Sequence, residues 1–275
     1  MPKPIEELTI ADDFMFGAVM RNPKYCKPLL ELVLGVKIRE IRYPEPQKTL
    51  EERYGSKSVR LDVYAEDDAG TVYDVEIQTA DKKNLPKRTR YYQGMIDLRI
   101  LERGGDYKAL RRSFVIFICA FDPFGKGRWV YTFDNLCRED TEIELGDGAT
   151  KIILNTKGYV GEIGAELKGL LRYMGGAAPE TAYARELESV VAEIRRDEKW
   201  RLDYMLISEK LMESERLGRH AERVAHARKF RGRFGADELA EICFVTPQLL
   251  QTILDAIDAH PDWDDREVAE NVDFD

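Results

Sequence analysis

The chain has 275 residues, of which 44% are hydrophobic and 34% charged, with 20 glycines and 11 prolines. This composition is that of a globular protein and excludes collagen-like, low-complexity and largely disordered classes. The longest apolar run covers eight residues, 114–121, which is too short to span a bilayer. The chain begins Met1-Pro-Lys-Pro-Ile-Glu-Glu, without the apolar segment of a signal peptide, so we expect a cytoplasmic protein with no membrane partner.

The few cysteines and histidines exclude several kinds of catalysis. The four cysteines lie far apart and form no Cys-x-x-Cys pair, so we expect small buried side chains and no disulfide or zinc site. The three histidines all lie in the last quarter, outside any His-Glu-x-x-His motif or triad pattern. Any chemistry must therefore use carboxylates, lysines or a bound metal.

The net charge of −9 is distributed unevenly. Residues 255–275 hold nine acidic residues against Arg266 alone, so the rest of the chain is nearly neutral. Two segments are locally basic: residues 82–112 have ten basic and three acidic residues, and residues 216–233 have seven basic residues against Glu222. Each segment considered alone is best explained as a solvated helix face. Together they mean that the negative net charge does not exclude a nucleic-acid partner.

The predicted elements change in type along the chain. Apolar spacing predicts helices over residues 9–34, ended by Gly35. Period-two alternation over residues 59–79, interrupted by a turn at 67–70, predicts a β-hairpin. Residues 86–103 have helical spacing, and the continuous apolar run 114–121 suits a strand buried on both faces. Further strands are expected at 129–133 and 151–154.

Every strong pattern after residue 161 is helical, and Gly175-Gly176 is the best candidate boundary. The sequence therefore predicts an α/β domain over residues 1–175 and an all-α region over residues 176–275. Within that region, residues 237–254 predict a helix-turn-helix, with Thr246 as the cap of the second helix and Pro247 at its start. An acidic tail over residues 255–275 follows.

The second helix of this pair carries no exposed Lys or Arg and offers Gln248, Gln251 and Thr252 instead. A packing or oligomerisation hairpin is therefore favoured over one that reads bases in a major groove. The basic segment before it could contact phosphate or could pair with the acidic tail in cis.

Two carboxylates are expected to meet in the hairpin. If residues 68–70 form its loop, Asp62 falls directly across from Glu76. Opposed like charges destabilise a sheet unless a cation lies between them, and Mg²⁺ prefers such oxygen ligands. An alternative is an exposed hairpin whose outer face is simply charged, and the spacing alone slightly favours this alternative.

Several ordered motifs resemble one known family. Arg60-Leu-Asp62-Val-Tyr-Ala, then Tyr73-Asp-Val-Glu76-Ile-Gln78, then Arg88-x-Arg90-Tyr91-Tyr92 resemble the PD-(D/E)xK nuclease core. More narrowly they resemble the recombination-promoting nuclease (Rpn) family, whose members are also described as transposases. Two further segments resemble the opening helix and a later motif of that family, namely Leu8-Thr-Ile-Ala-Asp12-Asp13-Phe14-Met-Phe16 and Glu198-Lys-Trp200-Arg-x-x-Tyr204-Met205.

The chain departs from the family pattern at two positions. Met15 stands where the opening helix often has Lys, which weakens any role for that position. Gln78 stands where the wider superfamily has Lys, although Gln is common in the narrower family. An amide cannot accept a proton from water at neutral pH, so Gln78 is not a general base.

The resemblance implies a restriction-endonuclease-like fold, a central mixed sheet flanked by helices, and a set of site residues. Asp62 and Glu76 would ligate Mg²⁺ or Mn²⁺, the carbonyl of Ile77 would add an oxygen, and Gln78 would orient the attacking water. Asp13 would be an accessory acid, although a plain N-cap is at least as plausible. DNA phosphates would be held by Arg88, Arg90 and Tyr92, although Tyr91 or Tyr92 must also pack on the sheet.

The implied function is a metal-dependent DNA endonuclease associated with recombination or mobile DNA. One alternative is a DNA-binding or assembly protein on a nuclease-like fold that no longer cuts. Another is a nuclease that acts on RNA, for which the sequence has no RNA-binding signature. The expected partners are DNA and a second copy of the chain, the latter through the C-terminal helices.

Overall fold

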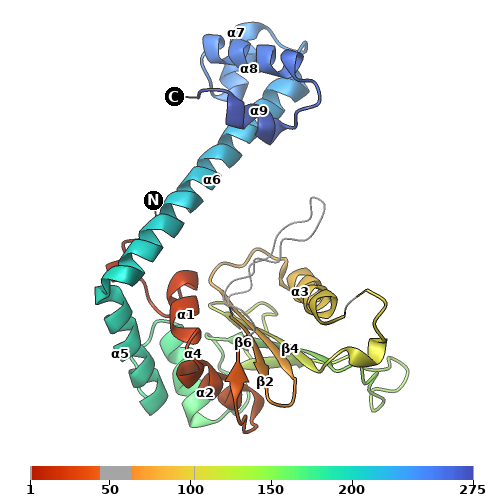
Figure 1. Cartoon of the computed structure of the whole chain (residues 1–275), viewed down its shortest axis with the longest axis vertical. Coiled ribbons are helices and arrows are strands. Elements are labelled where there is room, and N and C mark those ends of the chain that lie inside the picture. Colours follow the sequence, from red (N-terminus) through yellow and green to blue (C-terminus); the bar gives the residue numbers. More distant parts are fainter. Residues whose placement is uncertain (1, 44–62, 102, 275) are drawn as a thin grey trace. The chain divides into compact units, whose positions relative to one another are not determined.

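The structure is a computed structural model that describes residues 2–43, 63–101 and 103–274. The chain divides into two compact units, one of Pro4–Glu198 and one of Lys199–Asp275 with Met1–Lys3. Figure 1 shows the elements of both units. Among the described residues, none of the helices combines the length and the apolar character that a membrane span requires.

A six-stranded mixed sheet forms the centre of the first unit, with the strand order β1-β2-β3-β4-β6-β5. Strands β3, β4 and β6 are parallel, whereas the pairs β1–β2, β2–β3 and β5–β6 are antiparallel. The strands are β1 (Ile41–Arg42), β2 (Val63–Asp67), β3 (Val72–Gln78), β4 (Ser113–Cys119), β5 (Val130–Phe133) and β6 (Ala149–Asn155). Every residue of β3 and β4 is buried, which confirms that the apolar run is a strand covered on both faces.

The β2–β3 hairpin has the predicted register over its described residues. Val63 pairs with Val75, and the amide of Asp67 donates to the carbonyl of Thr71 at 3.0 Å. The Asp67 carboxylate accepts the amide of Thr71 at 2.8 Å, and Gly70 adopts a φ of +82°. The turn therefore combines an aspartate that bonds the backbone ahead of it with a glycine in the left-handed region.

Helices cover both faces of this sheet (Figure 1). One face is covered by α3 (Leu85–Ile100), which packs on β4. The other helices of this unit, which pack on one another and lie across the opposite face, are α1 (Asp13–Met20), α2 (Pro23–Leu34), α4 (Ala165–Met174) and α5 (Ala182–Arg196). Two single-turn 3-10 helices lie at Ile5–Glu7 and Tyr107–Ala109. The layers confirm the predicted α/β fold, a mixed sheet flanked by helices.

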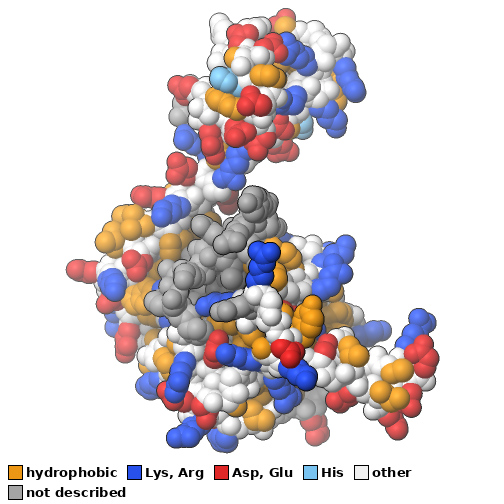
Figure 2. All heavy atoms as spheres, turned by 45° about the vertical axis from the view of Figure 1, so that its right-hand side comes forward, with side chains coloured by type: hydrophobic (Ala, Val, Ile, Leu, Met, Phe, Trp, Pro, Cys, Tyr) orange, Lys and Arg blue, Asp and Glu red, His pale blue; other side chains and the backbone are white. Residues whose placement is uncertain are grey.

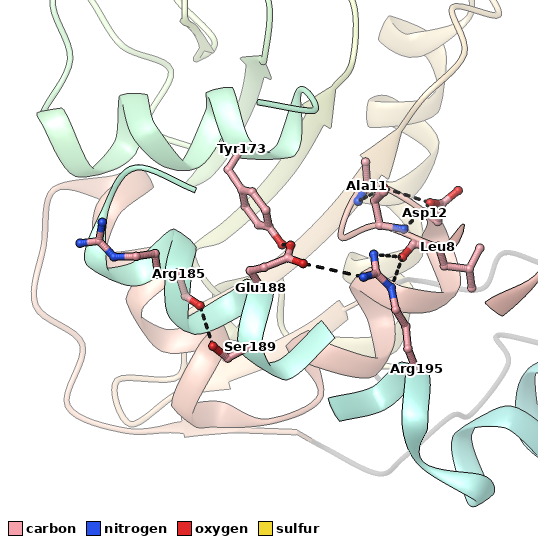
Figure 3. Close-up of polar contacts among 9 residues, drawn as sticks. Leu8, Ala11, Asp12, Tyr173, Arg185, Glu188, Ser189 and Arg195 are labelled. Atoms are coloured by element: carbon pink, nitrogen blue, oxygen red, sulfur yellow. Dashed lines mark hydrogen bonds and ion pairs between the residues drawn. The ribbon is translucent and has the colours of Figure 1, made fainter. Parts of the chain in front are cut away.

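Polar contacts join α5 to the rest of this unit (Figure 3). The guanidinium of Arg195 donates to the carbonyl of Leu8 at 2.9 and 2.6 Å. The Glu188 carboxylate accepts the hydroxyl of Tyr173 at 2.7 Å and lies 3.7 Å from Arg195. Because α5 is held by α4 and by the segment before α1, the compact unit continues past the predicted boundary at residue 175.

The second unit is helical, as predicted. It consists of α6 (Glu198–Phe230), α7 (Ala236–Cys243), α8 (Pro247–Ala259) and α9 (Asp265–Asn271). Helices α7 and α8 form the predicted helix-turn-helix pair, in which the hydroxyl of Thr246 accepts the amide of Leu249 at 3.2 Å. Their apolar faces pack with the end of α6 and with α9, in a core of Val224, Ala227, Leu239, Ala240, Cys243, Leu250, Ile253, Ile257, Val268, Ala269 and Val272.

The acidic segment 255–275 is part of this core and not a loose tail. Its helix α9 begins with a capping box, in which Asp264 and Glu267 bond each other's backbone amides. Arg228 pairs with Asp265 at 2.9 Å, and Nη2 of Arg231 bonds Asp258 at 2.6 Å. The basic segment 216–233 was expected either to contact phosphate or to pair with the acidic tail of the same chain. Arg228 and Arg231 pair with the acidic segment. On the face drawn in Figure 2, basic and acidic side chains are interspersed over this unit.

Candidate active site

A row of three polar side chains lies on β3, on the face that α3 covers. Asp74, Glu76 and Gln78 are 0%, 2% and 7% exposed. They pair in register with Val115, Phe117 and Cys119 of β4, which belong to the core cluster beneath α3. Since β3 has a neighbouring strand on each side and a helix above, the exposed-hairpin alternative is excluded for this strand.

The guanidinium of Arg88, in the first turns of α3, bonds this row directly. Its Nη1 donates to Oε1 of Gln78, and its Nη2 lies 3.4 Å from Oε2 of Glu76. Nη2 also donates to the hydroxyl of Tyr92 at 2.6 Å. The guanidinium carbon lies 5.2 Å from the ring centroids of Tyr92 and Phe117. Arg88 is therefore a half-buried cation held by two oxygens of β3 and by two aromatic rings.

Gln78 uses both ends of its amide. Its nitrogen donates to the carbonyl of Ala80 at 2.6 Å, while its oxygen accepts from Arg88. These two contacts fix the orientation of the side chain, with the oxygen directed toward the guanidinium. The amide can therefore position a polar group but cannot take a proton from it.

The two neighbouring tyrosines of α3 have different positions. Tyr92 is buried and packs on Phe117 with ring centroids 5.6 Å apart, whereas Tyr91 is 40% exposed. Burial, and then the charge of Glu76, raise the pKa of the Tyr92 hydroxyl. Tyr92 is thus the core tyrosine of the pair, and its hydroxyl faces Arg88. Arg90 lies on the exposed side of α3.

Asp13 is the first residue of α1, a helix that packs against β3. Partial burial and the charge of Asp12 raise the pKa of the Asp13 carboxyl, while Arg88 and Lys82 lower it. Asp13 therefore lies within electrostatic reach of Arg88. The N-cap alternative for Asp13 is wrong, because Asp12 takes the N-cap position of this helix.

The structure brings together only part of the predicted site. Glu76, Gln78, Arg88 and Tyr92 form one contact network, with Asp13 nearby. Asp62, the predicted partner of Glu76, lies outside the described residues. The Ile77 side chain is buried on the other face of β3. Within the described ranges, no three His, Cys, Asp or Glu side chains are grouped closely enough to hold a metal ion.

Sequence reasoning assigned no role to Asp74, the most buried member of the row. The charge of Asp74 contributes to the raised pKa of Tyr92, so the carboxylate lies near the network. The signal was present in the sequence, because Asp74 alternates with Glu76 and Gln78 in a strand followed by an apolar strand. Direct contact between Arg88 and the row was also not predicted.

Several basic residues of segment 82–112 are used within the fold. Arg99 lies 4.3 Å from the ring centroid of Tyr64, and Arg111 pairs with Glu66 at 2.7 Å. Three exposed cations around the start of α3, by contrast, form no ion pair within the described part of the chain. These are Lys82, Lys87 and Arg90.

A mixed sheet with a buried Glu-x-Gln row, covered by a helix that supplies an arginine, defines a nuclease-like core of the PD-(D/E)XK type. The family model for PD-(D/E)XK nuclease family transposases matches residues 13–159 of the chain. The match covers more than half of the sequence, and the chain belongs to this family. Comparison with curated proteins and with solved structures gave no match.

Proposed function

We propose that the chain is a cytoplasmic, metal-dependent DNA endonuclease of the Rpn type that acts in recombination or on mobile DNA. Family membership supports a nuclease-like function. The observation that carries the assignment of the site is the convergence of the Glu76 and Gln78 oxygens on one cationic group, the guanidinium of Arg88. A positive charge held between two oxygens at a buried site can stabilise the negative charge that develops on a phosphodiester during its cleavage.

The donors at this place fit a divalent metal. Carboxylate, amide and carbonyl oxygens are the ligands that Mg²⁺ and Mn²⁺ prefer. In the proposal, Glu76 and Asp62 hold the metal with the carbonyl of Ile77, and the position of Asp62 rests on the sequence register alone. When bound, the metal supplies a Lewis acid that activates water and neutralises charge on the scissile phosphate.

The chain's own side chains have distinct roles in this proposal. Gln78 orients the attacking water through its fixed amide, and Arg88 places positive charge beside the phosphate. Lys82, Lys87 and Arg90, exposed around the start of α3, contact flanking phosphates and position the DNA without reading its sequence. Asp13, at the start of the helix that packs against β3, is an accessory carboxylate in this proposal.

A second candidate is a DNA-binding or assembly protein that does not cut. It is favoured by the same contact, because Arg88 already bonds Glu76 and Gln78 and a guanidinium held there opposes a metal. The two candidates differ in whether a divalent cation displaces Arg88 from Glu76.

A plasmid assay separates them. Supercoiled DNA, and RNA in parallel, are incubated with purified protein with and without Mg²⁺ or Mn²⁺, beside Asp62→Asn and Glu76→Gln. Glu66→Gln is the matched control, because Glu66 lies on the same sheet but pairs with Arg111 outside the row. We expect metal-dependent DNA cleavage by the wild type and by Glu66→Gln only. Binding without cleavage supports the second candidate, and preferential RNA cleavage contradicts a DNA substrate.

A further inference from the structure

The first half of α6 exposes an apolar stripe. Leu202, Met205, Leu206 and Met212 are 53%, 49%, 46% and 41% exposed. At about 100° per residue they lie on one side of the helix, within roughly 120° of one another. Tyr204 is less exposed and lies on another side of the helix. Ser208, one turn before Met212, is buried and bounds the stripe on one edge. The stripe is therefore an exposed face of the helix that ends at Ser208.

The stripe has the spacing of a short coiled-coil seam. With Leu202 at a heptad position a, Met205 and Met212 take d positions and Leu206 takes an e position. Glu209 falls at the second a position. A charged residue at such a position costs stability.

The flanking charges are self-complementary for one antiparallel register. When Leu202 faces Met212 of a second copy, Met205 faces Glu209. The e positions then bring Lys199 opposite Glu213 in both halves, and the g positions bring Arg201 opposite Glu215. All four of these flanking contacts join opposite charges. Lys199 and Glu213 have no ion-pair partner in the described parts of their own chain.

We infer that this face of α6 binds the same face of a second copy in an antiparallel pair. The occupant is another copy of this chain, because the seam and its flanks complement themselves through a two-fold axis. The helix-turn-helix pair is not the docking surface, since its apolar side is buried in the core of its own unit. The stripe spans about 16 Å of helix, so we expect a weak, concentration-dependent dimer.

The test measures the mass of the full-length protein by sedimentation from low micromolar to several hundred micromolar concentration. Leu202→Glu places a charge in the seam and should leave only monomer. Leu211→Glu is the matched control, because Leu211 is 56% exposed on the opposite side of the same helix. That variant should dimerise as the wild type does.

Charge reversal tests the register itself. Lys199→Glu and Glu213→Lys each place like charges at two symmetrical sites, and we expect each to weaken the dimer by about 10-fold at low salt. The double variant restores opposite charges and should recover wild-type affinity. The inference is overturned by a wild type that stays monomeric, by equal loss in Leu202→Glu and Leu211→Glu, or by a double variant without recovery. Binding of the stripe to a different protein, with no self-association, also overturns it.

Discussion

Nη2 of Arg88 lies 3.4 Å from Oε2 of Glu76, so a guanidinium bonds the carboxylate at which the metal is proposed to bind. Glu76 is 2% exposed, and a carboxylate so far from water needs a nearby positive charge. Arg88 provides this charge from α3. The repulsion expected between two opposed carboxylates is thus offset within the fold, and Arg88 competes with a metal for Glu76.

Replacing Arg88 with Ala should therefore have two opposite effects. Without added metal, loss of the charge-assisted contact should lower the free energy of unfolding by about 1–3 kcal/mol. With Mg²⁺ or Mn²⁺, the variant should gain more stability than the wild type, because a competing cation has been removed. Calorimetry with and without metal measures both effects. Arg90→Ala, on the exposed side of the same helix, should unfold as the wild type does, and a similar loss in both variants would contradict the role of Arg88.

Gln78 should contribute positioning and no proton transfer. Gln78→Ala should slow cleavage by roughly 10²-fold through loss of orientation, with little change in metal affinity. Gln78→Lys should retain some activity, because Lys stands here in the wider superfamily, but its ammonium would lie beside Arg88 and should lower the unfolding temperature. Cleavage rates and calorimetry separate the two variants. An unchanged rate for Gln78→Ala would leave the amide with a structural role only.

The hairpin could be predicted because its register depends on local features. Period-two alternation identifies the strands, and the turn chemistry of Asp67 and Gly70 fixes the loop. The pair Val63–Val75 then follows from the sequence. The burial of β4 on both faces could also be predicted, because its unbroken run of apolar residues lies within the strand itself.

The contacts of α3 could not be predicted in this way, because they depend on how the helix lies across the sheet. Helical spacing places Tyr91 and Tyr92 near the boundary between the apolar and polar faces of α3. Only the tertiary structure shows that Tyr92 is buried and Tyr91 exposed. The long Arg88 side chain reaches β3 through the same placement. The acidic segment carries the capping signal Asp264-x-x-Glu267, which predicts the start of α9, whereas the burial of α9 in the core depends on tertiary packing.

Lys87 and Arg90 should contact DNA phosphates. Replacing either with Ala should weaken binding equally for unrelated sequences and should reduce the slope of log affinity against log salt by about 1. Arg112→Ala is a suitable control, because this arginine lies before β4 and stacks 5.0 Å from the ring centroid of Phe114. Binding measured over a range of salt gives the slope. A sequence-dependent loss would instead indicate contact with bases.

The helix α9 should be required for folding of the C-terminal unit. Val268 is fully buried in its core, so Val268→Asp would bury a charge and should lower the free energy of unfolding by about 3 kcal/mol or more. Glu270→Gln, on the exposed side of α9, should have little effect. Urea unfolding followed by circular dichroism compares them. Deleting residues 255–275 should likewise unfold this unit, so it cannot serve to test charge shielding.

The stability of the fold should depend on pH through Asp13. Burial and Asp12 hold the pKa of this carboxyl above its usual value in the folded chain. The folded state therefore binds the proton more tightly than the unfolded state does. The resulting stabilisation is fully present below the ordinary aspartate pKa and is lost as pH rises through the raised value. At neutral pH the ionised carboxylate therefore destabilises the folded state.

Asp13→Asn should consequently be more stable than the wild type at pH 7, and the difference should shrink to nothing as the pH falls below the ordinary aspartate pKa. Asp68→Asn, in the exposed β2–β3 turn, controls for the loss of one negative charge. Urea unfolding of both variants across this pH range measures the effect. An Asp13→Asn variant that is less stable than the wild type at pH 7 would show that attraction to Arg88 and Lys82 outweighs burial, and the carboxylate would then belong to the cationic network.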